Sequence, residues 1–192
     1  MVAPVYNTTW RNKLWMGWFY LQLPLILLVD LLEFIYPETM YKPEGSPLHF
    51  AWKLHEFYIS TYNDPIVQWS PQTAAQHDNW MGLFLHVEFL FLLPVVLWGL
   101  YRLGVQQNGT RGTDELLFFV YALEMAFTTL VCLHDTWYWD PTVYSDDLKW
   151  VFRSQLYGPW FFIPLLGAVD MGSRLVGRLN AAEEAAVVKK AN

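Results

Sequence analysis

Long apolar runs separated by polar stretches dominate the chain. Four runs reach the roughly 20 mostly apolar residues that a helix needs to cross a bilayer, and they cover about residues 14–36, 80–103, 116–137 and 151–176. None of them alternates with period two, and backbone groups in lipid can be satisfied only within helices or closed barrels. The pattern therefore predicts an all-α integral membrane four-helix bundle.

The long connection between the first two runs, residues 37–79, contains a second helical pattern. Phe50, Leu54, Phe57 and Tyr58 recur at helical spacing in HFAWKLHEFYISTY, which predicts a short amphipathic helix at the lumenal mouth of the bundle. The sequence NDP follows, and Asn63 or Asp64 can cap backbone amides in a turn there.

Composition supports the membrane assignment and excludes other classes. Only 16% of the 192 residues are charged, whereas soluble domains carry about 25%. The net charge of −6 and the absence of a basic cluster argue against a nucleic-acid partner. The single cysteine, Cys132, excludes an internal disulfide and a cysteine-based metal cluster.

The basic residues sort by side of the membrane. Four of them (Lys42, Lys53, Lys149 and Arg153) fall on one side of a four-span topology and the other eight on the opposite side: Arg11, Lys13, Arg102, Arg111, Arg174, Arg178, Lys189 and Lys190. By the positive-inside rule both termini are cytosolic. The expected organisation is a cytosolic tail over 1–13, a membrane domain over 14–178 and a second tail over 179–192. The final KKAN resembles a dilysine retrieval signal, which favours the endoplasmic reticulum membrane.

Acidic residues at membrane depth are the strongest candidates for function. Asp30, Glu88 and Glu124 all fall within predicted spans, and no lysine or arginine shares their depth. Charged and unpaired carboxylates are costly there. Such acids must share protons, accept hydrogen bonds from hydroxyls such as that of Thr128, or bind a cationic ligand. Asp170 has a partner, because Arg174 lies four residues further along the same helix.

Helical phase limits which side chains can converge. His86 and Glu88 are two residues apart and so point about 200° apart on a regular helix. Glu88 is in phase with Leu85 and Leu92, whereas His86 is in phase with Leu83 and Leu90. In the third run one polar stripe is formed by Glu124, Thr128, Val131 and Asp135. His86, Glu88, His134 and Asp135 are metal-ligand types, but their spacing matches no recognised pattern, and no metal or cofactor is expected.

Four motifs, in this order and spacing, resemble the EXPERA domain family, which groups the emopamil-binding sterol isomerases with the sigma-2 receptor. They are PLILLVDLLEFIYP, NDPIVQ, WMGLFLHVEFLFLLP and YGPWFFIP. The resemblance implies a four-helix bundle in the endoplasmic reticulum membrane with a pocket, open to lipid, for sterols and cationic amphiphiles. It implies that homodimers can form.

The resemblance also assigns roles to individual positions. Asp30 and Glu88 take the positions of the ligand-pocket acids, and Asp64 that of a structural loop acid. The structural prolines are Pro24, Pro94, Pro159 and Pro164. Further side chains expected to contact the ligand are those of Thr128, Asp135, Tyr157 and Trp160.

Two functions fit these residues. The first is a cofactor-free isomerase or cyclase acting on a sterol, terpenoid or similar lipophilic substrate through a carbocation. Glu88 and Glu124 would then be the acid–base pair, with His86 assisting and Asp30 stabilising the cation. Glu124 resembles the acid of the emopamil-binding branch and favours this interpretation. The alternative is a non-catalytic receptor for sterols or amphiphilic amines, in lipid trafficking or protein quality control. In a third interpretation the acids are packing devices of a scaffold protein.

Overall fold

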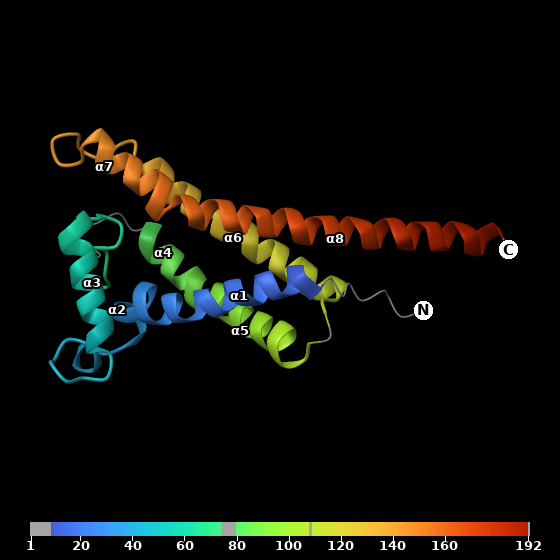
Figure 1. Cartoon of the computed structure of the whole chain (residues 1–192), viewed down its shortest axis with the longest axis horizontal. Coiled ribbons are helices and arrows are strands. Elements are labelled where there is room, and N and C mark those ends of the chain that lie inside the picture. Colours follow the sequence, from blue (N-terminus) through green and yellow to red (C-terminus); the bar gives the residue numbers. More distant parts are fainter. Residues whose placement is uncertain (1–8, 74–79, 108, 192) are drawn as a thin grey trace. The chain divides into compact units, whose positions relative to one another are not determined.

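A computed structural model describes residues 9–73, 80–107 and 109–191 as helices joined by turns (Figure 1). The first eight residues of the predicted N-terminal tail, and Asn192, lie outside this part of the chain. Contacts divide the chain into two compact units. One comprises Met16–Leu100, and the other comprises the chain up to Trp15 together with the residues from Tyr101 onward. Each unit is described by itself.

The unit Met16–Leu100 is built from short helical segments, some continuous with one another. They are most of α1 (Thr9–Leu25), a π-helical turn (Ile26–Asp30), α2 (Leu32–Ile35), a 3₁₀ turn (Glu38–Met40), α3 (His49–Tyr62), α4 (Trp80–Val87), a second π-helical turn (Glu88–Leu92) and α5 (Leu93–Gly99). Helix α1 packs closely on α5, because the ring of Phe19 lies where a side chain on Gly99 would have to go.

The first apolar run is not the single regular helix that its composition predicts. Its helix begins at Thr9 and runs through the π-helical turn, and then Leu31 leaves helical geometry with φ −96° and ψ 9°. Helix α2 ends one residue before Tyr36, which is extended (φ −102°, ψ 140°). Pro37 follows Tyr36, and a residue before proline is sterically pushed out of the helical region.

Helix α3 confirms the amphipathic helix expected in the long connection. It ends at Asn63, whose left-handed backbone (φ 52°) lets its N–H donate to the Ile59 carbonyl at 2.7 Å. Asp64 then accepts a hydrogen bond from the Ile66 N–H at 3.0 Å, which confirms the predicted turn. On its inner side, Ala51 packs against the buried residues Leu32 and Tyr41.

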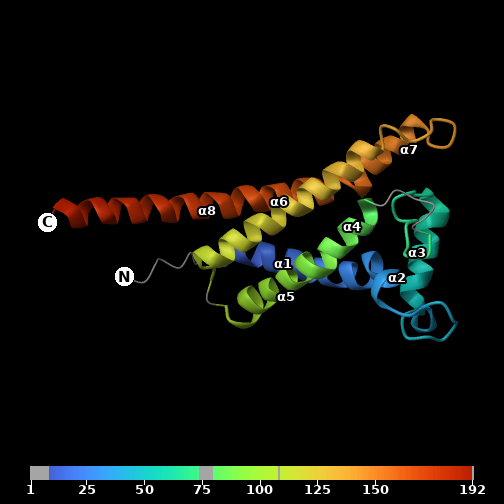
Figure 2. The same ribbon diagram turned by 180° about the vertical axis from the view of Figure 1, so that it is seen from behind.

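The other unit is organised around two long helices, α6 (Gly112–Asp135) and α8 (Gly158–Ala191), which lie side by side in both views (Figures 1 and 2). Between them are α7 (Asp146–Val151) and a π-helical turn (Phe152–Leu156). Near the start of α6, the Asp114 carboxylate accepts a hydrogen bond from the Arg111 N–H at 2.9 Å. Pro159 occupies the first turn of α8, where a helix does not need an N–H donor.

The second unit contains buried ion pairs both within one helix and between helices. Arg174 contacts Asp170 at 2.8 Å, as the spacing of four residues predicts. Arg178 contacts Glu115 on α6 at 2.5 Å, and Glu115 is fully buried. The second pair could not be anticipated, because its two members lie 63 residues apart.

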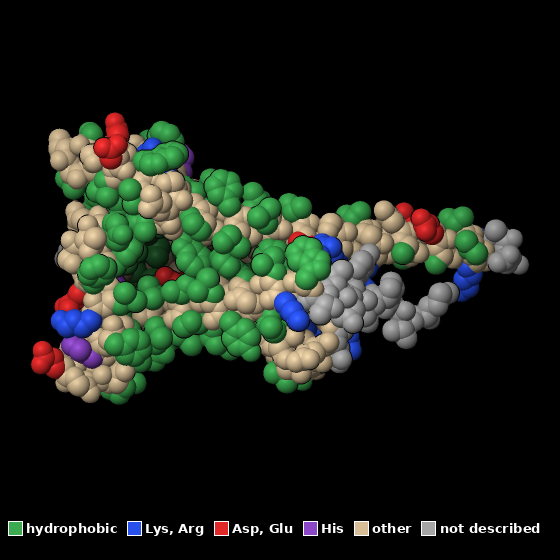
Figure 3. Space-filling view, viewed as in Figure 1, with side chains coloured by type: hydrophobic (Ala, Val, Ile, Leu, Met, Phe, Trp, Pro, Cys, Tyr) green, Lys and Arg blue, Asp and Glu red, His purple; other side chains and the backbone are tan. Residues whose placement is uncertain are grey.

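Helix α8 is longer than the predicted span. It continues past residue 176 to Ala191, because the segment AAEEAAVVKK consists largely of good helix formers. Figure 3 shows hydrophobic side chains over the visible surface of its first half and a mixture of acidic, basic and small apolar side chains over its distal half. The predicted tail after residue 178 is therefore helical up to Ala191.

Within the described residues, two helices have the length and apolar composition of membrane spans. They are Trp80–Val105 (26 residues) and Gly112–Asp135 (24 residues), each with a mean hydropathy of 2.1 in its most apolar window. Only 28% of each window is buried within the protein. Apolar helices that leave most of their surface uncovered are typical of membrane proteins, where lipid covers it.

Candidate functional site

The carboxyl groups of Asp30 and Glu88 are hydrogen-bonded to each other within the unit Met16–Leu100. Asp30 is the last residue of one π-helical turn and Glu88 is the first residue of another. Two carboxyl groups can form a hydrogen bond only if one of them carries a proton to donate. The fold thus brings together two acids from different apolar runs.

Phe34, His86 and Phe89 form an aromatic cluster in the same unit. Phe34, four residues after Asp30, has its ring centroid 4.8 Å from that of His86, edge to face, and 6.1 Å from that of Phe89. The Nδ1–H of His86 donates to the Gly82 carbonyl at 2.6 Å, since a carbonyl can only accept. Neutral His86 then has Nε2 as its acceptor nitrogen.

The structure separates the faces of the second span as its helical period predicts. Leu85 and Leu92, in phase with Glu88, are buried. Leu83 and Leu90, in phase with His86, are exposed by more than half of their surface. Glu88 accordingly lies on the packed side of the helix, and His86 on the outer side against Phe34.

Glu124 belongs to the other unit and lies on the predicted stripe of α6. Glu124, Thr128, Val131 and Asp135 are all half-buried. The Oε2 atom of Glu124 is buried and accepts no hydrogen bond from the described residues. The Thr128 hydroxyl donates to the carbonyls of Glu124 and Met125, both at 3.1 Å, rather than to a carboxylate.

The other predicted ligand contacts in this unit have structural partners. Asp135 accepts a hydrogen bond from Nε1 of the buried Trp139 at 2.8 Å. Tyr157 directly follows the π-helical turn Phe152–Leu156, and its ring centroid lies 5.9 Å from that of Phe152. The Trp160 carbonyl accepts a hydrogen bond from the Thr129 hydroxyl at 3.4 Å.

Most of the predicted structural residues lie at a helix end or beside a π-helical turn. Asp64 is fully buried and accepts a hydrogen bond from the Tyr58 hydroxyl at 2.7 Å. Pro24 precedes one π-helical turn by two residues, and Pro94 follows the other by two. Proline lacks an N–H and its ring crowds the preceding turn, so regular α-helical bonding is interrupted near both carboxyls. Pro164 lies within α8.

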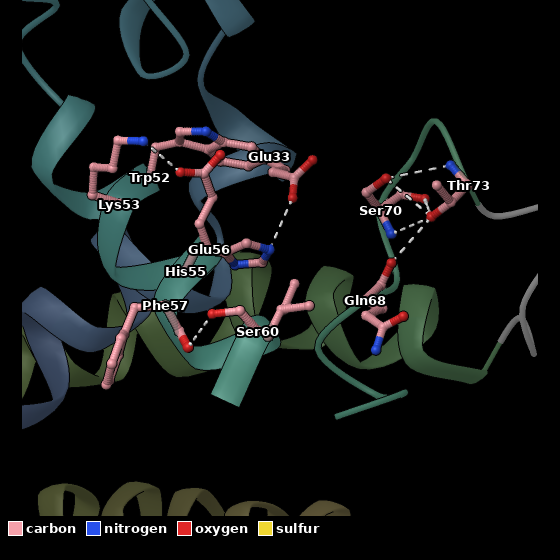
Figure 4. Close-up of a pocket in the computed structure, with 11 residues that line it drawn as sticks. Glu33, Trp52, Lys53, His55, Glu56, Phe57, Ser60, Gln68, Ser70 and Thr73 are labelled. Atoms are coloured by element: carbon pink, nitrogen blue, oxygen red, sulfur yellow. Dashed lines mark hydrogen bonds and ion pairs between the residues drawn. The ribbon is translucent and has the colours of Figure 1, made fainter. Parts of the chain in front are cut away.

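The sequence did not indicate the surface groove beside α3 that Figure 4 shows. Within it, Nε2 of His55 lies 3.4 Å from the Glu33 carboxylate. His55 is only 8% exposed, and burial lowers the pKa of its imidazole. The groove contains none of the predicted ligand or catalytic residues. The described residues contain no cluster of three or more His, Cys, Asp or Glu that could hold a metal ion.

Comparison with known proteins places these features in a family. The model of the EXPERA (EXPanded EBP superfamily) family matches residues 50–171. The chain is also 29% identical over 142 residues to "Efficient mitochondria targeting-associated protein 19" of Schizosaccharomyces pombe (strain 972 / ATCC 24843). That alignment covers 72% of this chain and 66% of the relative, slightly less than two thirds of its length. With well over half of its length matched by the family model, the chain belongs to the EXPERA family of membrane proteins.

Proposed function

We propose that the Asp30–Glu88 carboxyl pair is the polar centre of an intramembrane site for a lipophilic ligand with a positively charged group. The observation that carries the proposal is the hydrogen bond between the two carboxyls. Among the described residues, no salt bridge from a lysine or arginine reaches Asp30. Two acids that share a proton can exchange it for a cation.

We propose the endoplasmic reticulum as the membrane and four spans as the topology. The two spans that meet the length and hydropathy criteria support this, together with α1 and α8 as the remaining crossings. Membership of the EXPERA family, whose resemblance implies the endoplasmic reticulum membrane, supports that location.

The test compares wild-type protein with the double variant Asp30→Asn/Glu88→Gln. An amide can still donate a hydrogen bond to its neighbour, so volume and pairing are retained while the acidic proton is lost. Binding of a lipophilic tertiary amine should weaken at least tenfold, whereas binding of its uncharged carbon isostere should change less than twofold. Glu38→Gln, an exposed acid of the same unit, is the matched control and should bind both normally.

The pH dependence of binding provides an independent readout. If the cation displaces the shared proton, amine affinity should rise with pH by up to about tenfold per unit while the pair remains protonated. The double variant should show no such rise. Equal affinities of the wild type and the double variant for the amine at every pH would contradict the proposal.

The second candidate function is a cofactor-free isomerase or cyclase working on the ligand of this site. The observation that favours it is Glu124, whose buried Oε2 accepts no hydrogen bond from the described residues. A carboxyl group that accepts no hydrogen bond from the protein is suited to proton transfer to a ligand. An isomerisation or cyclisation needs two such groups with different proton affinities in a site without water. His86 Nε2 is an acceptor that can assist.

Catalysis and binding can be separated with one substitution. Glu124→Gln should abolish double-bond migration in sterols or terpenoids while amine binding survives, and Glu115→Gln, an acid of the same helix with an arginine partner, is the comparison variant. An untargeted metabolite comparison between wild-type and deletion strains tests the enzyme function. If it finds no altered sterol or terpenoid, the enzyme function is refuted and the non-catalytic receptor is the remaining hypothesis. The S. pombe relative is named for mitochondria targeting, which supports a role in targeting for that receptor.

A further inference from the structure

Helix α3 carries a row of large apolar side chains that the described residues leave uncovered. Phe50 is 61% exposed, Leu54 52% and Phe57 63%. At about 100° per residue these three positions fall within a sector roughly 60° wide. The row is therefore one continuous apolar face of the helix and not a scatter of single exposed side chains.

The rest of the helix surface is divided just as clearly. Ala51 and His55 are buried, and Tyr58 donates a hydrogen bond to the buried Asp64. The exposed residues Lys53, Glu56 and Ser60 lie in the opposite direction, and Lys53 pairs with Glu56 at 2.8 Å. Helix α3 thus has a core side, a water-facing charged side and the apolar row between them. In Figure 4 Phe57 extends away from the Glu33–His55 pair.

We infer that the Phe50–Leu54–Phe57 row inserts into the bilayer surface and anchors α3 in the interface. The partner is lipid, because the same unit also has an apolar exterior on a helix with the length and composition of a membrane span. In that unit the span beginning at Trp80 exposes Leu83, Leu90 and Leu97 by half or more of their surfaces. A helix with an apolar face beside a charged face lies in the plane of the interface with its apolar side buried among the acyl chains.

Anchoring of α3 has a consequence for the segment that carries Asp30. Helix α3 contacts the π-helical turn Ile26–Asp30 and holds Glu33 through His55. The membrane surface therefore supports the part of the chain on which the proposed ligand acid lies. This anchoring does not depend on ligand binding, so the two proposals can fail separately.

Site-directed spin labelling tests the orientation. In a Cys132→Ala background reconstituted in phosphatidylcholine vesicles, single cysteines replace Leu54 and Phe57 on the row, and Lys53 and Ser60 on the charged side. Labels at Leu54 and Phe57 should collide several-fold more with oxygen, which partitions into lipid, than with a water-soluble nickel chelate. Labels at Lys53 and Ser60 should show the reverse preference.

Two results would overturn the inference. The first is equal access of the nickel chelate to all four positions, which would leave α3 in water. The second is immobilised labels at Leu54 and Phe57 that neither reagent reaches, which would mean that protein covers the row. If Cys132→Ala lowers the yield of folded protein, photocrosslinking replaces the spin labels. The photoreactive residue p-benzoylphenylalanine at position 57 of the otherwise native chain then distinguishes lipid from protein as the partner of the row. Its photoadducts should be to lipid, and adducts to protein alone would refute the inference.

Discussion

At the scale of single residues, Asp64 shows how burial makes a loop acid structurally important. It is fully buried and accepts hydrogen bonds from the Tyr58 hydroxyl and the Ile66 N–H. Burial, together with the adjacent Asp64 carboxylate, raises the pKa of Tyr58, so the phenol stays protonated and remains a donor. These contacts join the end of α3 to the loop that follows it.

Removal of this carboxylate should destabilise the protein. Asp64→Ala leaves two buried donors without an acceptor, and we expect a loss of about 2–4 kcal/mol in the free energy of unfolding. Asp140→Ala is the matched control, because Asp140 makes the same kind of contacts to the Thr142 N–H and hydroxyl, at 2.8 and 2.7 Å, but on the surface. It should cost less than about 1 kcal/mol. Unfolding in detergent micelles measures both, and equal losses would show that burial is not the cause.

His55 makes stability depend on pH. Its pKa lies below the ordinary value of 6.5 because burial disfavours the charged imidazole, although the nearby acid Glu56 opposes this effect. The unfolded chain therefore binds this proton more readily, and stability falls as the pH drops below 6.5. The change per pH unit is at most about 1.4 kcal/mol.

Thermal unfolding at pH 7.5 and 5.5 measures this linkage. The wild type should lose more stability on acidification than His55→Gln, in which no imidazole titrates at this position. Every other titrating group contributes equally to both proteins, so the difference isolates His55. A steeper loss in His55→Gln than in the wild type would reverse the predicted sign.

At the scale of elements, close packing of α6 on α8 depends on small residues. A Cβ on Gly167 would lie 3.3 Å from the Trp15 ring and 3.5 Å from the Cβ of Ala122. Small side chains at helix contacts allow this approach, which supplies the van der Waals packing that holds membrane helices together. Beyond this contact, the ion pair between Arg178 and Glu115 links the same two helices.

Gly167→Leu should therefore disrupt the α6–α8 contact. Overpacking typically costs about 1–3 kcal/mol, which should appear as a lower unfolding midpoint in micelles. Gly17→Leu is the control, because a Cβ on Gly17 meets no atom within 4 Å, and glycine is a poor helix former. Gly17→Leu should be neutral or stabilising, and an equal loss in both variants would contradict the packing argument.

At the scale of the whole molecule, topology is the property that most constrains function. The proposed four crossings would place both termini on one side of the membrane, and the positive-inside count predicts that this side is cytosolic. A tag after Asn192 should be digested by protease in sealed microsomes without detergent, and so should a tag before Met1. Protection of either tag would refute the four-span arrangement or its orientation.

Local sequence patterns were enough to predict several helices, one ion pair and one turn of this protein. Apolar run length identified membrane helices, helical spacing identified α3 and the Asp170–Arg174 pair, and NDP identified the turn at Asp64. The motifs also pointed to the EXPERA family, which the family comparison confirms. Each of these depends on residues within a few positions of one another, where backbone periodicity alone decides which side chains meet.

Only the tertiary structure decided which distant side chains pair. The Asp30–Glu88 hydrogen bond, the Glu33–His55 contact and the Arg178–Glu115 ion pair join residues far apart in the chain. The π-helical turns at Asp30 and Glu88 made this harder to foresee. Each extra residue in a turn rotates all following side chains by about 100° relative to a regular helix, so a phase calculated from sequence no longer applies beyond it. Composition could place acids in the membrane, but the path of the backbone determined which of them share a proton.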